Sequence, residues 1–312
     1  MNILVVGSVA LDTIATPDKS VKRALGGSAT YFSTAARYFA PVRLVGVVGN
    51  DFPEEHVKFL KSRDIDIKGL TTETGPTFHW QGEYGPDFGD ARTIDTQLGV
   101  FADFHPVIPE QFRDSQFVFL ANIDPELQLE VLEQVNDPLV TALDTMNYWI
   151  TGKPEALKKT LAKVDILLIN ETEAQMLAGI DNLFQAAQAV MDMGPGTLVI
   201  KRGGSGALLF HRPYESGGEP GLFSVPAFLL DKISDPTGAG DTFAGGFVGY
   251  LASAGSLNSE SVRQAVVAGS VMASFNVQSF SLERLGSISR NDIQKRLDEF
   301  AARTSFKPIK IE

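Results

Sequence analysis

The chain has 312 residues, of which 44% are hydrophobic and 21% are charged, so it is long enough to bury a sizeable core. Its formal net charge of -11 argues against broad electrostatic attraction to nucleic acid or to an anionic membrane surface. The absence of cysteine excludes disulfides, thiolate nucleophiles and cysteine metal sites, and the four histidines are too scattered to suggest a ligand cluster.

The first residues and the hydropathy favour a cytoplasmic protein. Met1 and Asn2 lead directly into an apolar run, without the basic region or the cleavage site of a secretion signal. No uninterrupted apolar run approaches the ~20 residues that a bilayer-spanning helix needs. We therefore expect a protein of the cytoplasm that has neither a membrane nor a nucleic acid as its partner.

Short apolar runs alternate with stretches of helical periodicity, which is typical of a largely parallel sheet covered by helices. The predicted strands are 3–6, 42–48, 116–120, 140–143, 166–169, 197–200 and 207–210. The predicted helices between them are 125–134, 153–163, 171–178 and 183–193. The pattern predicts a three-layer α/β fold that forms a single domain over residues 1–312.

Two segments break this pattern, at about 11–25 and about 77–101. Their strands are too short or too polar for the main sheet, so we expect them to pair into a small β-layer that forms a lid. Such a detached layer leaves an apolar face that is usually covered by a ligand, by a second subunit or by both. We expect this face to supply a homodimer contact; its residues are Phe78, Trp80, Tyr84, Ile94 and Leu98.

The strongest local signal is the segment 235–241, which reads Asp-Pro-Thr-Gly-Ala-Gly-Asp. Gly238, Ala239 and Gly240 let backbone N–H groups approach a ligand, and an apolar run of small residues after them predicts a helix. This arrangement is typical of an anion hole. Asp241, at the same helix start, is placed to accept a proton from a hydroxyl that attacks a phosphoryl group. The structural alternative is a tight turn with a capping aspartate.

This segment resembles the C-terminal signature of the ribokinase-like (PfkB) carbohydrate kinases, which is written around Asp-Thr-x-Gly-Ala-Gly-Asp. The last four residues match, and Asp235 and Thr237 match the flanking positions, while Pro236 differs from the common residue. The resemblance implies a ribokinase-like fold with a β-lid, ATP as the phosphate donor and Asp241 as the general base. It also implies that Thr237 contacts the nucleotide and that Asp235 and Thr237 form a site for K⁺.

The acceptor side is expected to form near the N-terminus. Gly26 and Gly27 resemble the N-terminal glycine signature of the family, and a glycine pair lets the backbone approach a polar substrate or serves as a hinge. Asp12 stands at the position of the substrate-binding aspartate, and Asn50 lies in a segment similar to one that closes over the substrate. Tyr31 replaces an asparagine that contacts substrate hydroxyls in many members.

Two further segments follow predicted strands in the order of the family. Asn170 and Glu173 are suited to hold the waters of a Mg²⁺ that bridges phosphates, or simply to cap a helix. Lys201, Gly203 and Gly206 after the next strand leave room for nucleotide phosphates or ribose, or form a hairpin turn. The resemblance implies that both segments bind ATP with Mg²⁺.

The resemblance thus implies an ATP-dependent carbohydrate kinase that moves the γ-phosphate to a hydroxyl of a small sugar or sugar-like acceptor. Segment 144–149 lacks the arginine of the family pattern Asp-x-Asn-x-Arg, so the acceptor half departs from the common sequence. Because aromatic residues surround the predicted acceptor region, a nucleoside kinase is the alternative. A non-catalytic sensor of sugars or nucleotides is a third reading, against which the retention of Asp241 argues.

Two other classes of nucleotide-binding protein are excluded because the sequence lacks their motifs. A Rossmann dehydrogenase needs Gly-x-Gly-x-x-Gly after the first strand, and segment 7–11 lacks the second and third glycines. A P-loop enzyme needs Gly-Lys followed by Ser or Thr, but Pro154 follows Gly152 and Lys153.

Overall fold

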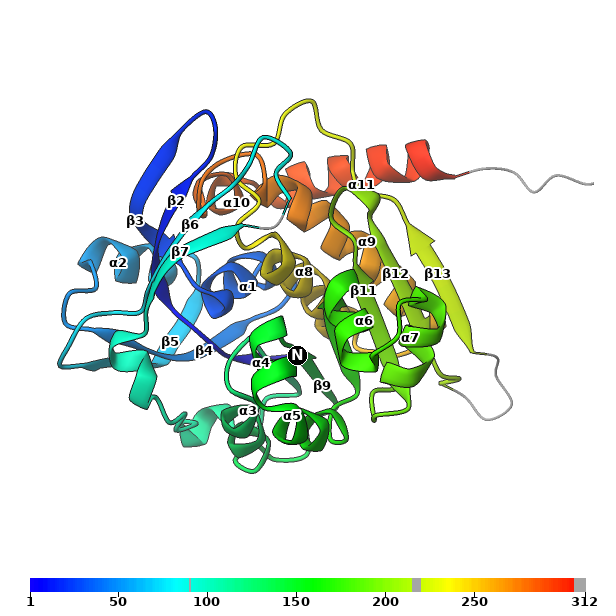
Figure 1. The fold of residues 1–312 in the computed structure, drawn as a ribbon, viewed down its shortest axis with the longest axis horizontal. Coiled ribbons are helices and arrows are strands. Elements are labelled where there is room, and N and C mark those ends of the chain that lie inside the picture. Colours follow the sequence, from blue (N-terminus) through cyan, green and yellow to red (C-terminus); the bar gives the residue numbers. More distant parts are fainter. Residues whose placement is uncertain (90, 215–219, 306–312) are drawn as a thin grey trace, which may run out of the picture.

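The computed structural model describes residues 1–89, 91–214 and 220–305. A nine-stranded sheet in the order β13-β12-β11-β10-β9-β8-β1-β4-β5 runs through the molecule, with helices on both faces (Figure 1). The strands from β5 to β11 along this order are parallel, whereas β12 and β13 are antiparallel at one edge. The bounds are β1 Ile3–Val6, β4 Val42–Gly49, β5 Ile65–Glu73, β8 Phe117–Leu120, β9 Val140–Asp144, β10 Ile166–Asn170, β11 Thr197–Lys201, β12 Ala207–His211 and β13 Gly221–Val225.

The helices form the outer two layers. None of them, within the described ranges, is long and apolar enough to cross a membrane. Their bounds are α1 Ser28–Ala36, α2 Glu54–Ser62, α3 Pro125–Leu132, α4 Asn147–Gly152, α5 Pro154–Leu161, α6 Glu171–Ala178, α7 Leu183–Met191, α8 Ala239–Ala254, α9 Ser259–Asn276, α10 Glu283–Ser287 and α11 Arg290–Thr304.

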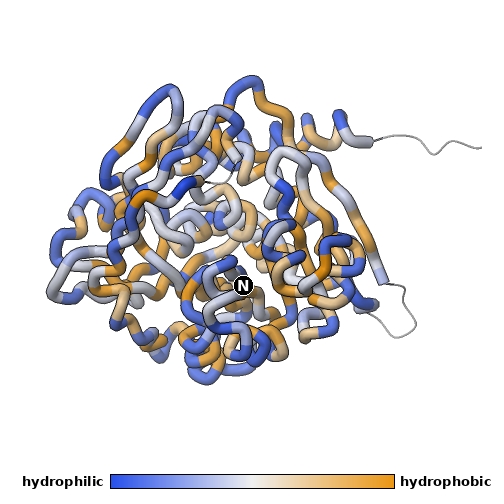
Figure 2. The backbone as a smooth tube through the Cα atoms, viewed as in Figure 1, coloured by the Kyte–Doolittle hydropathy of each residue, from blue (hydrophilic) through white to orange (hydrophobic). Residues whose placement is uncertain are grey.

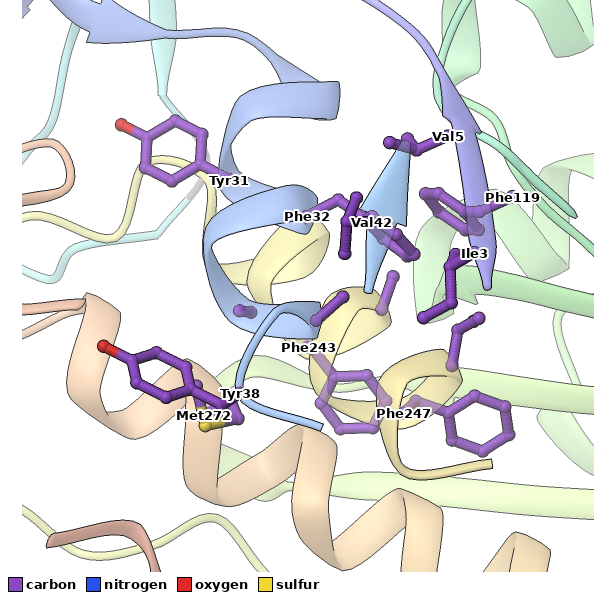
Figure 3. Packing of buried hydrophobic residues seen from close by; sticks show 14 of the residues in the cluster. Ile3, Val5, Tyr31, Phe32, Tyr38, Val42, Phe119, Phe243, Phe247 and Met272 are labelled. Atoms are coloured by element: carbon purple, nitrogen blue, oxygen red, sulfur yellow. The ribbon is translucent and has the colours of Figure 1, made fainter. Parts of the chain in front are cut away.

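The sheet separates two apolar clusters, because alternate residues of each central strand point to opposite faces. On β1, Val5 packs with buried residues of α1, α8 and α9, whereas Val6 packs with buried residues of α3, α5 and α7. Figure 3 shows the first cluster, in which the rings of Phe32 and Phe119 stack at 4.1 Å. Hydrophilic segments lie mostly at the periphery (Figure 2). The prediction of a three-layer α/β fold is confirmed.

All seven predicted strands form, with ends within one residue of the prediction, and the four predicted helices end within two residues. The sequence does not predict β5 and β13, the two edge strands of the large sheet. Much of each edge strand is exposed, so neither shows the continuous apolar run that marks the central strands.

A separate four-stranded sheet covers part of the molecule, in the order β3-β2-β6-β7. Its strands are β2 Ala10–Ala15, β3 Ser20–Gly26, β6 His79–Glu83 and β7 Arg92–Gln97, and they come from the two segments that were expected to form a lid. β2 follows directly after β1 and β6 follows β5, so the small sheet grows from the carboxyl ends of two strands of the large sheet (Figure 1). In open α/β sheets this end is where ligands bind.

Candidate active site

The carboxyl ends of three neighbouring strands carry polar side chains. Asp144 ends β9, Asn170 ends β10 and Lys201 ends β11, so their side chains leave the sheet at the same edge. The first turn of α8 approaches this edge, since a Cβ atom added at Gly240 would lie 3.2 Å from the Nζ of Lys201. Residues predicted separately for the nucleotide and for catalysis are therefore brought together.

The predicted anion loop leads into α8, a helix of 16 residues. Gly238 precedes the helix with φ of 71°, in the left-handed region that favours glycine. A Cβ atom there would also lie 2.4 Å from atoms of the Tyr31 ring, so no other residue fits. The first N–H groups of a helix lack partners within it and carry the positive end of its dipole. The N–H of Ala239 donates to the carbonyl oxygen of Pro236 at 3.1 Å, so the N–H groups of Gly238 and Gly240 are the ones of the predicted loop that are suited to bind phosphate oxygens.

Asp241 lies half-buried in the first turn of α8. Burial raises the pKa of its carboxyl group to about 7, the nearby carboxylate of Asp144 adds to the rise, and the ammonium of Lys201 opposes it. A carboxylate whose pKa is close to neutral is a stronger proton acceptor than an exposed aspartate and still ionises at working pH. The position and the pKa of Asp241 suit a general base.

A buried ion pair lies beside this base. Lys201 donates from Nζ to the Oδ2 of Asp144 at 2.7 Å, and the two side chains are 15% and 6% exposed. Because Asp144 and Lys201 end β9 and β11, the pair reaches across the end of β10 between them. Burial alone would lower the pKa of Lys201, but the carboxylates of Asp144, Glu173 and Asp241 raise it above its usual value. Lys201 is therefore held as a cation.

Sequence reasoning does not include Asp144 among the site residues. The signal for it is an acidic residue directly after the predicted strand 140–143, at the end of the sheet where ligands bind. Its second carboxylate oxygen accepts from the N–H of Thr145 at 2.8 Å. Asp144 is thus fixed on both sides, by its own strand end and by Lys201.

Asn170 and Glu173 form a reciprocal capping box at the start of α6. The N–H of Glu173 donates to the Oδ1 of Asn170 at 2.8 Å, and the N–H of Asn170 donates to the Oε2 of Glu173 at 2.7 Å. Glu173 is 9% exposed and acts electrostatically on Lys201 and Asp241, which places its carboxylate in the same cluster. The described residues hold no group of three or more His, Asp or Glu side chains that could cage a metal. The pair fits a Mg²⁺ that keeps most of its water shell.

The turn after β11 leaves space on one side. No atom comes within 4 Å of a Cβ added at Gly203, whereas a Cβ at Gly206 would lie 2.0 Å from the carbonyl oxygen of Val225. Gly203 therefore offers open backbone to a ligand, and Gly206 is required by packing against the chain after β13.

The predicted acceptor residues Asp12, Gly26 and Gly27 meet between the small sheet and α1. Asp12 is 5% exposed, a Cβ at Gly26 would lie 1.9 Å from its Oδ2, and the N–H of Gly27 donates to its carboxylate. Burial, followed by the charges of Asp235 and Asp241, raises the pKa of Asp12 to about 7. This carboxyl group is therefore electrostatically coupled to that of Asp241.

Asn50 is placed differently from the other predicted acceptor residues. It is exposed, and its Oδ1 accepts from the N–H of Gly75 at 3.2 Å. The next residue, Asp51, accepts from the N–H and the hydroxyl of Thr77 at 2.7 Å, and from Arg23 on β3 at 2.8 Å. Asn50 and Asp51 thus hold the segments that connect the small sheet to the large one.

The residues predicted to bind K⁺ lie in a dense polar network. Asp235 is fully buried and accepts from the N–H groups of Thr237 at 2.9 Å and of Ser281 at 3.2 Å. The carbonyl of Thr237 accepts from the Nδ2 of Asn276 at 2.7 Å, and the Oδ1 of Asn276 is buried without a partner in the described part of the chain. A buried carboxylate, a carbonyl and an unpartnered amide oxygen fit a weakly hydrated cation.

The small sheet also reaches the anion loop directly. The hydroxyl of Tyr84, one residue after β6, and the hydroxyl of Thr237 lie 3.0 Å apart and share a hydrogen bond. On β6, the Nε1 of Trp80 donates to the hydroxyl of Thr93 on β7 at 3.2 Å. The small sheet therefore contacts the anion loop through Tyr84.

Known proteins are similar to this chain over most of its length. Residues 1–285 match the model of the pfkB family of carbohydrate kinases. The cytidine kinase of Thermococcus kodakarensis is 32% identical over 255 residues, covering 80% of this chain and 88% of that protein. The ribokinase of Bacillus subtilis is 25% identical over 318 residues, covering 95% and 99%. The solved nucleoside kinase of Burkholderia thailandensis in complex with inosine shares the fold, with a TM-score of 0.75 at 17% identity, covering 98% and 100%.

Proposed function

Because this chain belongs to the pfkB family of carbohydrate kinases and is an ATP-dependent kinase of small hydroxyl-bearing acceptors, we propose that Asp241 activates the attacking hydroxyl. The observation that carries this proposal is the position of Asp241, directly after the glycine turn, half-buried beside Lys201 and with its pKa raised to about 7. No other carboxylate of the cluster stands in the first turn of α8.

The transfer is a single displacement at the γ-phosphorus. The acceptor oxygen forms the new P–O bond while the bond to the oxygen between the β- and γ-phosphates breaks, the hydroxyl proton passes to Asp241, and ADP leaves. The N–H groups of Gly238 and Gly240 donate to the transferring oxygens, where negative charge is spread in the transition state, while the N–H of Ala239 donates to the carbonyl oxygen of Pro236 and supports the turn. The ammonium of Lys201 balances this charge from the strand side.

The nucleotide is proposed to lie along the ends of β10 and β11. Lys201, Gly203 and Gly206 border its phosphates or ribose, and Thr237 contacts it from the anion loop. Asn170 and Glu173 would hold a Mg²⁺ through water, and this ion would neutralise phosphate charge. Asp235 and Thr237, with the amide oxygen of Asn276, would hold K⁺ beside the loop.

The acceptor is proposed to lie between the glycine pair and the lid, with Asp12 binding its hydroxyls and Asn50 joining when the lid closes. A sugar or sugar-like acceptor follows from the family. A nucleoside is the second candidate, supported by the 32% identity to a cytidine kinase and by the aromatic residues Trp80 and Tyr84 of the lid segment. Aromatic rings provide a stacking surface for a nucleobase. The single domain and the cytoplasmic location remain predictions.

A phosphorylation assay against a panel of sugars, polyols, phosphosugars and nucleosides tests this function. With ATP and Mg²⁺, we expect equal amounts of ADP and phosphorylated product from at least one class, and cytidine and ribose represent the two candidates. If no acceptor increases the release of ADP above the acceptor-free rate, the chain is a binding protein with a kinase fold.

We predict that activity requires Mg²⁺ and rises with K⁺. The reason is that Asn170 and Glu173 fit a hydrated Mg²⁺, while Asp235 and Thr237 surround an oxygen-rich site for a weakly hydrated ion. Initial rates with excess EDTA test the first claim, and full activity there would refute it. Replacing K⁺ by a bulky organic cation at constant ionic strength tests the second, for which an unchanged rate is the contradicting result.

We predict that the small sheet acts as a lid, so that Trp80→Ala raises the KM for the acceptor or lowers kcat while the KM for ATP stays unchanged. Closure would also exclude water from the γ-phosphate, so that ATP hydrolysis without an acceptor is slow. We further propose that the apolar face of this sheet forms a homodimer contact, because its members Ile94 and Leu98 are 43% and 46% exposed. Wild-type kinetics of Trp80→Ala, together with a monodisperse monomer in light scattering, would exclude both proposals.

A further inference from the structure

Gln128 is a fully buried polar side chain on α3. Its Nε2 atom donates to the carbonyl oxygens of Ala121 at 2.9 Å and of Asp144 at 3.0 Å, and it lies 3.5 Å from the carbonyl oxygen of Leu120. Because these partners only accept hydrogen bonds, the amide nitrogen must face them, and its two N–H groups supply one donor to each of the two nearer oxygens. The side chain therefore joins the ends of two strands.

The bridge that Gln128 forms begins where the pairing of β8 with β9 ends. The last paired residues of these strands are Leu120 and Leu143, and the chain continues from them to Ala121 and Asp144. On its other side the end of β9 is still paired with β10. The amide of Gln128 thus reaches from α3 and takes the place of the next backbone bond between β8 and β9. It fixes the backbone of Asp144 on the side that the sheet leaves free.

The side chain of Asp144 connects this bridge to the candidate active site. Its Oδ2 accepts from the Nζ of Lys201 at 2.7 Å, and its Oδ1 accepts from the N–H of Thr145 at 2.8 Å. The same Nζ would lie 3.2 Å from a Cβ atom added at Gly240. A series of direct contacts therefore runs from Gln128 through the buried ion pair to the first turn of α8.

Two further bonds join the turn after β8 to the segment after β9. The Oδ1 of Asn122 accepts from the Nε1 of Trp149 at 3.1 Å, and Asp124 accepts from the Nζ of Lys153 at 2.7 Å. Of these three links, that of Gln128 is the one that contacts the end of β9 itself. Its loss should therefore loosen the end of β9 without separating the two segments.

We propose that Gln128 is a positioning residue for phosphoryl transfer, which holds the end of β9 so that Asp144 keeps the ammonium of Lys201 against the anion loop. This inference rests on the proposed function, because it assigns a residue to the same reaction. Lys201 balances charge that develops in the transition state, so a displaced ammonium lowers kcat more than it weakens binding of the acceptor. A displacement of about 1 Å can cost ~10²-fold in rate.

Gln134 provides a matched control in the same region. It is a half-buried glutamine two residues after α3, and its Nε2 donates to the carbonyl oxygens of Pro106 at 2.8 Å and Glu130 at 3.1 Å. Its Oε1 accepts from the N–H of Ile108 at 2.9 Å. Gln134 thus also binds backbone carbonyls through its amide, but its partners lie outside the candidate active site. Replacement by methionine removes the amide of either glutamine and keeps a side chain of similar length.

The test is a mutant cycle that places Gln128→Met and Gln134→Met in the wild type and in Asp144→Leu/Lys201→Met, which lacks both positioned side chains. With an acceptor that the wild type phosphorylates, we expect Gln128→Met to lower kcat about tenfold and to leave the KM for the acceptor unchanged. In the double variant the same change should lower kcat by less than about twofold, because the group that it positions is gone. Gln134→Met is expected to lower Tm and to leave kcat unchanged in both backgrounds.

Two outcomes would overturn the inference. If Gln128→Met keeps the wild-type kcat, its bridge serves the fold only. If Gln128→Met lowers kcat about tenfold in both backgrounds, it does not act through Asp144 and Lys201. Should Gln128→Met not fold, Gln128→Leu takes its place in the cycle with the same expected values. A wild type that phosphorylates no acceptor overturns the proposed function instead, so the two failures are distinguished.

Discussion

Asp241→Asn is expected to lower kcat by at least ~10²-fold and to leave the KM for ATP close to its wild-type value. The amide keeps the shape and the hydrogen bonding of the side chain, but it cannot take the proton of the attacking hydroxyl. Steady-state kinetics with each substrate varied in turn measure both constants. A variant with near-normal kcat would remove Asp241 from the mechanism.

The same substitution is expected to stabilise the ligand-free protein at pH 8. The folded-state pKa of Asp241, about 7, lies above the ordinary value of 3.8, so its contribution to stability is full below pH 3.8 and is lost as pH rises through 7. Above pH 7 the buried charge opposes folding, and a neutral amide removes this cost. We expect a rise in Tm of about 2–4 °C at pH 8 that shrinks toward pH 4.

Asp114 is the matched control for this gain. It is exposed, and hydrogen bonding from Arg43 lowers the pKa of its carboxyl group, so its contribution to stability has the opposite sign. Asp114→Asn should leave kcat unchanged and should not raise Tm at pH 8. An equal gain in both variants would mean that net charge, and not the burial of Asp241, sets the effect.

Lys201→Met is expected to have the second largest effect, on both rate and stability. It removes the cation that faces the transferring phosphoryl group, for which we expect a loss of ~10²-fold or more in kcat. It also leaves Asp144 buried without its partner, and breaking a buried pair from one side typically costs ~3–5 kcal/mol of unfolding free energy. Kinetics and denaturant unfolding measure the two effects separately.

The double variant Asp144→Leu/Lys201→Met separates these two roles. Because it removes both charges, it should recover most of the stability that Lys201→Met loses, as buried pairs replaced by apolar residues usually do. Its kcat should stay as low as that of the single variant. Recovery of the wild-type kcat in the double variant would make the pair a purely structural feature.

The central strands could be read from the sequence because helices cover both of their faces, which makes each of them an uninterrupted apolar run. The edge strands β5 and β13 lack this signal, since much of each is exposed. The two halves of the lid were recognisable as irregular segments. The two halves form one sheet because β2 pairs in parallel with β6, and this pairing joins residues almost 70 positions apart. A pairing over that separation gives no local signal in the sequence.

The sequence predicts those parts of the candidate site whose residues are close together in the chain. Gly238, Gly240 and Asp241 stand within four residues, so their spacing alone predicts an anion loop with a base. The pair of Asp144 and Lys201 lies 57 residues apart in the chain, and the bond between Tyr84 and Thr237 spans 153. Only the fold brings such residues together, and the raised pKa values that follow from burial depend on the same long-range packing.

The pH dependence of kcat/KM for the acceptor tests the central claim most directly, because it reports the ionisation of groups in the enzyme before the acceptor binds. With saturating ATP and Mg²⁺, the account predicts a fall of about tenfold per pH unit below an apparent pKa near 7. Since the pKa of Asp12 is also raised to about 7, the profile of Asp12→Asn is needed beside that of the wild type. If Asp12→Asn shows the same fall in kcat/KM at low pH as the wild type, Asp241 is supported as the base. A wild-type kcat/KM that does not change from pH 5.5 to 8.5 would contradict the account. So would a fall at low pH that is present in the wild type and absent in Asp12→Asn.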